Sequence, residues 1–138
     1  AGAGGAYLKA QGKILLVRQF RYAYGEELLE IPAGKLNPGE DPALTAAREL
    51  EEETGYVPEK VNLLYTMYPT PGYTNEKIYI YEAEGVRAGK EHPDEDEFIT
   101  SSFYPADEVC RMIERGEIRD AKTIIAVQNY LLKGKGLL

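Results

Sequence analysis

The stretch from residue 34 to residue 56 constrains this chain most, because a tight loop leads directly into a short helix crowded with carboxylates. Proline suits the first turn of a helix and glycine suits its C-terminal cap. Pro42 and Gly55 therefore predict a helix from about Pro42 to Thr54. Glycines and prolines of the preceding loop fold the chain tightly before that helix. The question for any fold of this chain is which charge neutralises the carboxylates of this helix.

Three glutamates of the predicted helix share one face. Glu49, Glu52 and Glu53 follow the i, i+3, i+4 spacing, at which like charges repel one another. A hard divalent cation such as Mg²⁺ or Mn²⁺ would neutralise them, because it prefers oxygen ligands. The alternative is a solvated acidic face with Arg48 as an ion-pair partner, and helix charge alone favours that alternative. The constrained loop, with Glu40 near the positive end of the helix dipole, favours a built site.

Helical and extended patterns alternate along the chain and predict one layered α/β domain over residues 1–138. The run from Ile14 to Val17 is apolar throughout, as in a strand buried on both faces, and Gln11 and Gly12 suit the turn before it. We predict strands at residues 6–10, 13–18, 28–31, 61–68, 76–84 and 98–104, and helices at 42–54, 105–116 and 121–133. The first residue is not methionine, so the sequence leaves open whether residues precede it.

The loop and helix also reproduce a long motif. The matching residues are Gly34, Glu40, Arg48, Glu49, Leu50, Glu52, Glu53 and Gly55, with Tyr56 in a final slot that is usually Ile, Leu or Val. This pattern resembles the Nudix box, and the order of the predicted strands agrees with that family over nearly the whole chain. The resemblance implies the Nudix fold, a mixed β-sheet sandwiched between α-helices (α/β/α). It also implies an enzyme that hydrolyses a nucleoside diphosphate linked to another moiety.

The resemblance assigns roles by position within the motif. The implied metal ligands are the Ala33 carbonyl, Glu49 and Glu53, with Glu52 as a further ligand or metal-site base. Arg48 would orient the carboxylates by charge-assisted hydrogen bonds, and Glu40 would hold the loop against the helix. A pyrophosphate repels nucleophiles through its own charge, and clustered divalent cations offset that charge and activate water. We therefore expect Mg²⁺ as the cofactor, with Mn²⁺ as a substitute.

Segments outside the motif resemble the ADP-ribose pyrophosphatase branch of the family. These segments are residues 17–22 ahead of 29–34, residues 70–76 with Pro71 placed 15 positions after the motif, and the acidic run 94–97 followed by 115–118. By this resemblance Arg21 contacts the diphosphate or the terminal ribose, unless it is only a surface cation. Tyr22 would stack on adenine, with core packing or a dimer contact as alternatives. Pro71 and Gly72 are the remaining predicted substrate contacts.

The acidic run carries the predicted general base. In this branch a loop supplies a glutamate that takes a proton from the attacking water, and Glu95 is the residue we assign to it. The register leaves Asp94 and Asp96 open, and a solvated charge run is the alternative without function. The predicted reaction is Mg²⁺-dependent hydrolysis of ADP-ribose to AMP and ribose 5-phosphate. Another nucleoside diphosphate sugar, or a non-catalytic ADP-ribose-binding module, are the rival hypotheses.

Composition bears on partners and location. The net charge of −7 and the pI of about 4.8 argue against nucleic acid as a partner. No apolar run approaches the roughly 20 residues that span a bilayer, so we predict no membrane insertion. Cys110 is the only cysteine, which fits a reducing compartment, and we predict a cytoplasmic protein. The resemblance further implies a homodimer. We expect the N-terminal extension that serves dimerisation in this branch to be absent or short here.

Overall fold

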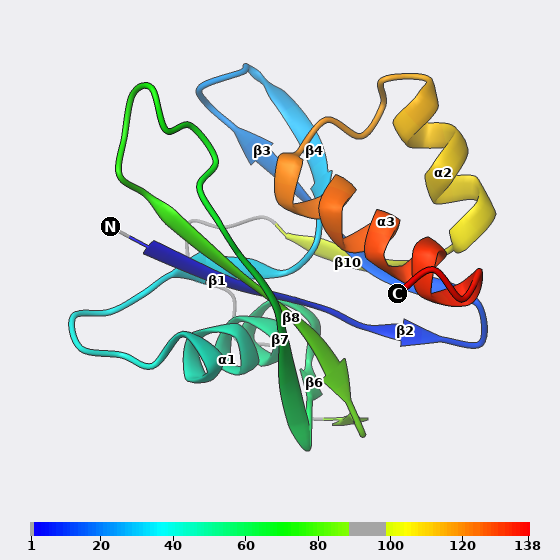
Figure 1. Cartoon of the computed structure of the whole chain (residues 1–138), viewed down its shortest axis with the longest axis horizontal. Coiled ribbons are helices and arrows are strands. Elements are labelled where there is room, and N and C mark those ends of the chain that lie inside the picture. Colours follow the sequence, from blue (N-terminus) through cyan, green and yellow to red (C-terminus); the bar gives the residue numbers. More distant parts are fainter. Residues whose placement is uncertain (1, 89–98) are drawn as a thin grey trace.

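The computed structural model describes residues 2–88 and 99–138 (Figure 1). Thirteen elements follow one another in the described part of the chain. They are β1 (Gly2–Tyr7), β2 (Lys9–Ala10), β3 (Lys13–Arg21), β4 (Glu26–Glu30), β5 (Ala33–Lys35), α1 (Pro42–Thr54), β6 (Tyr56–Val57), β7 (Lys60–Met67), β8 (Lys77–Glu84), β9 (Arg87–Ala88), β10 (Thr100–Pro105), α2 (Ala106–Glu114) and α3 (Ala121–Gly134). No helix among the described residues is long and apolar enough to cross a membrane.

Two four-stranded sheets form the centre of the molecule. One has the order β5-β1-β8-β7, in which β1 is parallel to β8 and all other pairs are antiparallel. The other is antiparallel, with β3 paired to β10, to the short β2 and to β4. The small pair β6-β9 lies apart from both. The predicted mixed sheet is confirmed, although further strands pair in a second sheet.

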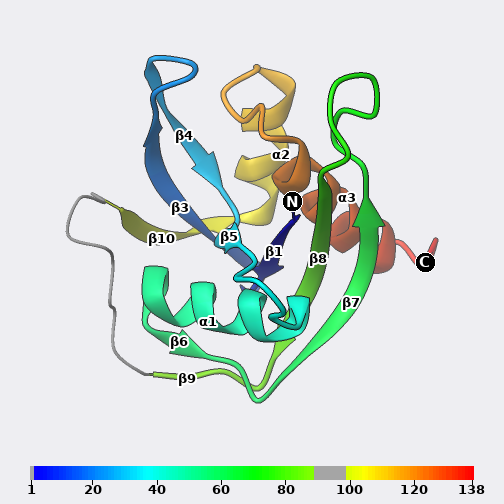
Figure 2. The same ribbon diagram turned by 90° about the vertical axis from the view of Figure 1, so that its left-hand side faces the viewer.

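Helices cover the sheets from both sides, as Figures 1 and 2 show: α1 lies on one side, and α2 and α3 lie on the other. Alternate residues of one strand enter the two hydrophobic clusters between these layers. Leu15 joins the cluster that contains Leu50 of α1, whereas Ile14 and Leu16 join the cluster that contains Val109 of α2. The apolar run in β3 is therefore buried on both faces, as predicted, and the α/β/α arrangement is confirmed.

The first strand was predicted at 6–10, but β1 begins at Gly2 and only the short β2 lies beyond Tyr7. The glycine-rich start gave no strand signal, because glycine is depleted in strands. Packing explains the difference. A Cβ on Gly4 would lie 2.8 Å from the Pro42 carbonyl oxygen, and one on Gly5 would lie 2.9 Å from Cβ of Ala33. The missing side chains let α1 and β5 approach β1 closely.

Local signals at the ends of elements were more reliable. Helix α1 has the predicted bounds: Asp41 accepts a hydrogen bond from the Ala43 amide at 2.8 Å, and Gly55 closes the helix at φ +80°. Gln11 and Gly12 both have positive φ, which suits the two-residue turn between β2 and β3. The short β5, β6 and β9 were not predicted, because two or three residues show no periodicity.

Candidate active site

A cavity of about 890 Å³ is lined by residues of β3, β4, β5, α1 and the start of α3. Two groups of charged side chains meet there. We call the first the α1 cluster, which consists of Glu40, Arg48, Glu49, Glu52 and Glu53. We call the second the Arg21 cluster, which consists of Arg21, Glu30, Asp120 and Lys122. All of these residues except Glu40 line the cavity.

Arg48 is the centre of the α1 cluster. Its Nη1 donates to Glu49 Oε1 at 2.8 Å and to Glu52 Oε2 at 3.3 Å. Its Nε and Nη2 donate to the two carboxylate oxygens of Glu40 at 3.1 and 3.0 Å. These contacts suit the predicted orienting role, and they equally suit the ion-pair alternative. One guanidinium therefore serves three carboxylates.

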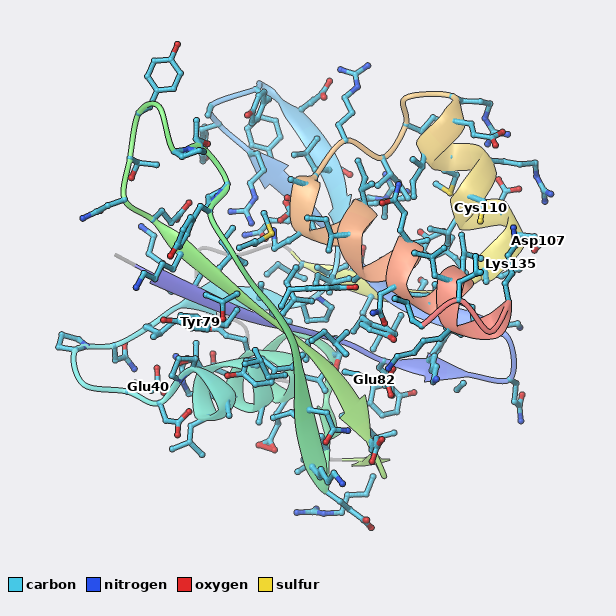
Figure 3. All side chains as sticks on the ribbon, viewed as in Figure 1. Glu40, Tyr79, Glu82, Asp107, Cys110 and Lys135 are labelled. Carbon is cyan, nitrogen blue, oxygen red and sulfur yellow. The ribbon has the colours of Figure 1, made fainter. Side chains whose placement is uncertain are left out.

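Glu40 holds the loop against the helix, as predicted; Figure 3 labels its side chain beside the N-terminal end of α1. Its carboxylate accepts hydrogen bonds from the Asn37 amide at 3.1 Å, in the loop, and from the Thr45 hydroxyl at 2.8 Å, in α1. The Arg48 guanidinium above all, with the Asn37 amide and the Thr45 hydroxyl, lowers the pKa of Glu40 to about 2. Glu40 thus stays ionised and keeps Arg48 in place.

Backbone shape brings the carboxylates close to residues 33 and 34. A Cβ added to Gly34 would overlap the carboxyl group of Glu49, so glycine lets this side chain lie against the backbone. The amide of Ala33 donates to Glu53 Oε2 at 3.3 Å, and Glu53 is only 6% exposed. The backbone of Ala33 and the carboxylates of α1 therefore form one oxygen-rich corner of the cavity.

The donors of this corner fit a hard divalent cation in kind. They are carboxylate and carbonyl oxygens, which Mg²⁺ and Mn²⁺ prefer, and Arg48 alone does not balance the carboxylates around it. Within residues 2–88 and 99–138, no three His, Cys, Asp or Glu side chains are already gathered around a common point suited to a metal ion. In the structure Glu49 and Glu52 both accept hydrogen bonds from Arg48.

The Arg21 cluster is arranged around a buried carboxylate. Glu30, whose side chain is 3% exposed, accepts hydrogen bonds from Arg21 Nε at 2.7 Å and Nη2 at 2.9 Å. It also accepts one from Lys122 Nζ at 2.7 Å, and Lys122 lies 3.0 Å from Asp120. Burial opposes the charge of Glu30, but the Arg21 hydrogen bonds and the Lys122 charge outweigh it and lower its pKa. Arg21 is thus an anchored side chain of the cavity wall.

Sequence reasoning missed Glu30, Lys122 and Asp120 as parts of the site. A signal existed for Glu30, which is the one charged residue in the predicted strand 28–31. A charge inside such a strand has to find a partner when it is buried. For Lys122 no local signal existed, since a lysine in a first helical turn is unremarkable by itself. Only the packing of α3 against β4 brings it to Glu30.

The other predicted site residues are placed less centrally. Tyr22 lines the cavity at its rim, where it is 92% exposed, and its ring meets Phe20 edge-on at 5.0 Å. Pro71 and Gly72 are exposed in the connection between β7 and β8, and neither is among the described residues that line the cavity. Glu95, with its alternatives Asp94 and Asp96, lies outside the described residues.

A family model described as "NUDIX domain" matches residues 1–127. The chain belongs to the Nudix family. Members of this family generally depend on a divalent metal ion, which agrees with the oxygen donors beside Gly34. The matched range includes α1 and the loop before it.

Individual relatives extend the comparison. An ADP-ribose pyrophosphatase of Bacillus subtilis (strain 168) is 42% identical over 125 residues, which are 89% of this chain and 68% of that protein. A protein of Bacillus methanolicus named methanol dehydrogenase activator is 45% identical over 126 residues, again 89% of this chain and 68% of that protein. The crystal structure of an ADP compounds hydrolase matches 99% of this chain and 75% of its own with a TM-score of 0.85 at 23% identity, which shows the fold.

Proposed function

We propose that this Nudix protein hydrolyses the pyrophosphate bond of ADP-ribose, releasing AMP and ribose 5-phosphate. One observation carries the proposal: a carboxylate-rich corner and an anchored guanidinium line the same cavity of about 890 Å³. A diphosphate that binds through metal ions needs carboxylates to hold the cations and a guanidinium to bind its anionic oxygens. The 42% identical ADP-ribose pyrophosphatase supports the choice of sugar.

Mg²⁺ is the proposed cofactor, with Mn²⁺ as a substitute. The Ala33 carbonyl, Glu49, Glu52 and Glu53 would hold it, since they are oxygen donors of one corner. When bound, a divalent cation offsets the charge of the pyrophosphate and makes water more acidic. Arg48, held by its bonds to Glu40, would orient the carboxylates of Glu49 and Glu52.

The chain's own residues bind the substrate and move the proton. Arg21 uses Nε and Nη2 for Glu30, so Nη1 carries two further donors for the diphosphate or the terminal ribose. Tyr22 offers a ring at the rim for adenine, and Pro71 and Gly72 remain proposed contacts from the β7-β8 connection. Glu95 is the proposed base. It takes a proton from water while a new P–O bond forms and the bridging P–O bond breaks.

A substrate panel tests the proposal. The protein is incubated with Mg²⁺ and with ADP-ribose, GDP-mannose or another nucleoside diphosphate sugar in ¹⁸O-labelled water, and the products are identified by mass spectrometry. We expect ADP-ribose to have the highest kcat/KM, with the label in one of its two phosphate products. A higher kcat/KM for GDP-mannose would refute the choice of sugar. Binding of ADP-ribose without turnover in Mg²⁺ or Mn²⁺ would favour the non-catalytic module.

The 45% identical relative suggests a second candidate function, activation of a dehydrogenase of the kind its name states. To test this function, the protein or its Glu53→Gln variant is added to an alcohol dehydrogenase, and the rate of the dehydrogenase is measured. Stimulation by the wild type would support the candidate, and loss of stimulation in the variant would tie it to the same corner. A single cytoplasmic domain that forms homodimers remains part of the proposal, and light scattering measures the dimer.

A further inference from the structure

Lys122 is the most buried lysine of the cavity, and its ammonium group is enclosed by charged side chains. It is 8% exposed, and its ammonium lies against Glu30 and Asp120. A buried ammonium is costly unless it is paired, and an apolar side chain would avoid that cost. Glu30 already has a bidentate partner in Arg21. Lys122 thus brings a second cation to a carboxylate that Arg21 already pairs, and Asp120 balances the added charge.

Helix α3 and strand β4 fix Lys122 in this place. The Thr123 hydroxyl donates to Asp120 Oδ2 at 2.6 Å and accepts a hydrogen bond from the Ile31 amide at 2.8 Å. Asp120 also accepts a hydrogen bond from the Thr123 amide at 3.3 Å, as an N-cap does. These bonds tie the first turn of α3 to the end of β4. The Lys122 ammonium is thus held at one oxygen of Glu30.

Lys122 and Arg21 are connected through the carboxylate of Glu30, to which both donate hydrogen bonds. Oε1 receives both Lys122 Nζ at 2.7 Å and Arg21 Nη2 at 2.9 Å, and Oε2 receives Arg21 Nε at 2.7 Å. Without the ammonium, only Arg21 would hold the Glu30 carboxylate, and a turn of the carboxylate would carry the guanidinium with it. The ammonium leaves one orientation in which both oxygens are satisfied.

We propose that Lys122 is a positioning residue for the reaction: by fixing the buried carboxylate of Glu30, it aims the guanidinium of Arg21 at the substrate phosphates. This inference rests on the proposed function for its substrate, but the orientation of Arg21 is a property of the free protein. Lys122 itself touches no substrate in this account. Its loss should therefore weaken substrate binding through Arg21 and should raise KM more than it lowers kcat.

A double-mutant cycle tests the proposal. We expect Lys122→Met to lower kcat/KM for ADP-ribose by about 10- to 100-fold, as for a lost charged hydrogen bond, mainly through KM. In a Glu30→Gln background the same substitution should change kcat/KM by less than about threefold, because the carboxylate that relays the effect is gone. Effects that multiply in the double variant would overturn the proposal, and so would a wild-type kcat/KM in Lys122→Met.

The matched control is Lys133→Met on the same helix. Lys133 lies 3.6 Å from Glu82, another buried carboxylate, which keeps Lys9 and Tyr7 as partners and is labelled in Figure 3. This variant should change the free energy of unfolding but leave kcat/KM as it is. If Lys122→Met does not fold, Lys122→Ala, which removes the same donor to Glu30, replaces it in the cycle. A loss of kcat/KM in Lys133→Met equal to that in Lys122→Met would count against positioning.

NMR separates this proposal from the proposed function. The Nε–H signal of Arg21 reports its hydrogen bond to Glu30 without any substrate. We expect Lys122→Met to shift this signal and to speed its exchange with water, and Lys133→Met to leave both unchanged. An absence of ADP-ribose turnover in the wild type would refute the proposed function alone. An Arg21 signal that is identical in Lys122→Met and wild type would overturn the positioning role in either case.

Discussion

The two charged clusters of the cavity differ in charge balance and in burial. In the α1 cluster, Arg48 is a single cation bonded to Glu40, Glu49 and Glu52, and the Glu52 side chain is 33% exposed. In the Arg21 cluster, the cations match the carboxylates in number, and Glu30 is almost fully buried. Buried charge has to be balanced, whereas excess charge is tolerated where solvent or a ligand reaches it. The first cluster is thus suited to accept a cation, and the second to hold a cation in place.

The largest expected effect comes from the α1 cluster. Glu53→Gln keeps the shape of the side chain but removes the charge of a proposed metal ligand, so turnover of ADP-ribose should fall by several orders of magnitude. Glu51→Gln, which alters a glutamate of the same helix outside the cavity lining, is the matched control and should keep turnover close to wild type. Steady-state kinetics of the three proteins measures the difference. Wild-type turnover in Glu53→Gln would show that Glu53 is not a metal ligand needed for the reaction.

A base outside both clusters should affect turnover and not metal binding. Glu95→Gln should lower kcat by about 100-fold or more, as is typical when a general base is lost. The Mg²⁺ concentration that gives half-maximal rate should stay unchanged. Asp94→Asn and Asp96→Asn are the comparison variants, because the sequence register leaves both open. If one of them loses kcat and Glu95→Gln does not, the base belongs to that position.

The Arg21 cluster should govern substrate affinity. Arg21→Lys keeps the charge but cannot bond both oxygens of Glu30 and still present a fork to a phosphate, so KM should rise by about 10- to 100-fold. The control is Arg18→Lys on the same strand, where the partner Glu27 is exposed and 3.9 Å away. Equal KM values for the two variants would show that Arg21 does not contact the substrate. Both values come from initial rates over a range of ADP-ribose concentrations.

The smallest effect is on stability in acid. The pKa of Glu40 is lowered from its ordinary 4.5 to about 2, so this group stabilises the fold above pH 4.5. That contribution is lost as the pH falls from 4.5 through 2, because the unfolded chain takes up the proton first. Glu40→Gln lacks the group, so its free energy of unfolding should approach that of the wild type over this interval. Urea titrations that stay parallel from pH 6 to pH 2.5 would speak against the Arg48 bond.

Sequence reasoning predicted elements with local signals and missed those set by packing. The bounds of α1 followed from Pro42 and Gly55, which act within one turn of the chain. The start of β1 did not, because Gly4 is in a strand through its pairing with the distant β5 and β8. The same division holds in the site. The glutamates of α1 are periodic on one helix, whereas Lys122 meets Glu30 across 92 residues, and no local pattern signals that contact.

The proposed dependence of hydrolysis on a divalent cation is tested by a chelation experiment. Hydrolysis of ADP-ribose is measured in excess EDTA and again while free Mg²⁺ is raised stepwise. We expect no hydrolysis in EDTA and a saturable recovery with Mg²⁺ in the wild type, with Glu53→Gln needing much more Mg²⁺ for any recovery. Equal rates of ADP-ribose hydrolysis in EDTA and in Mg²⁺ would contradict the proposed dependence.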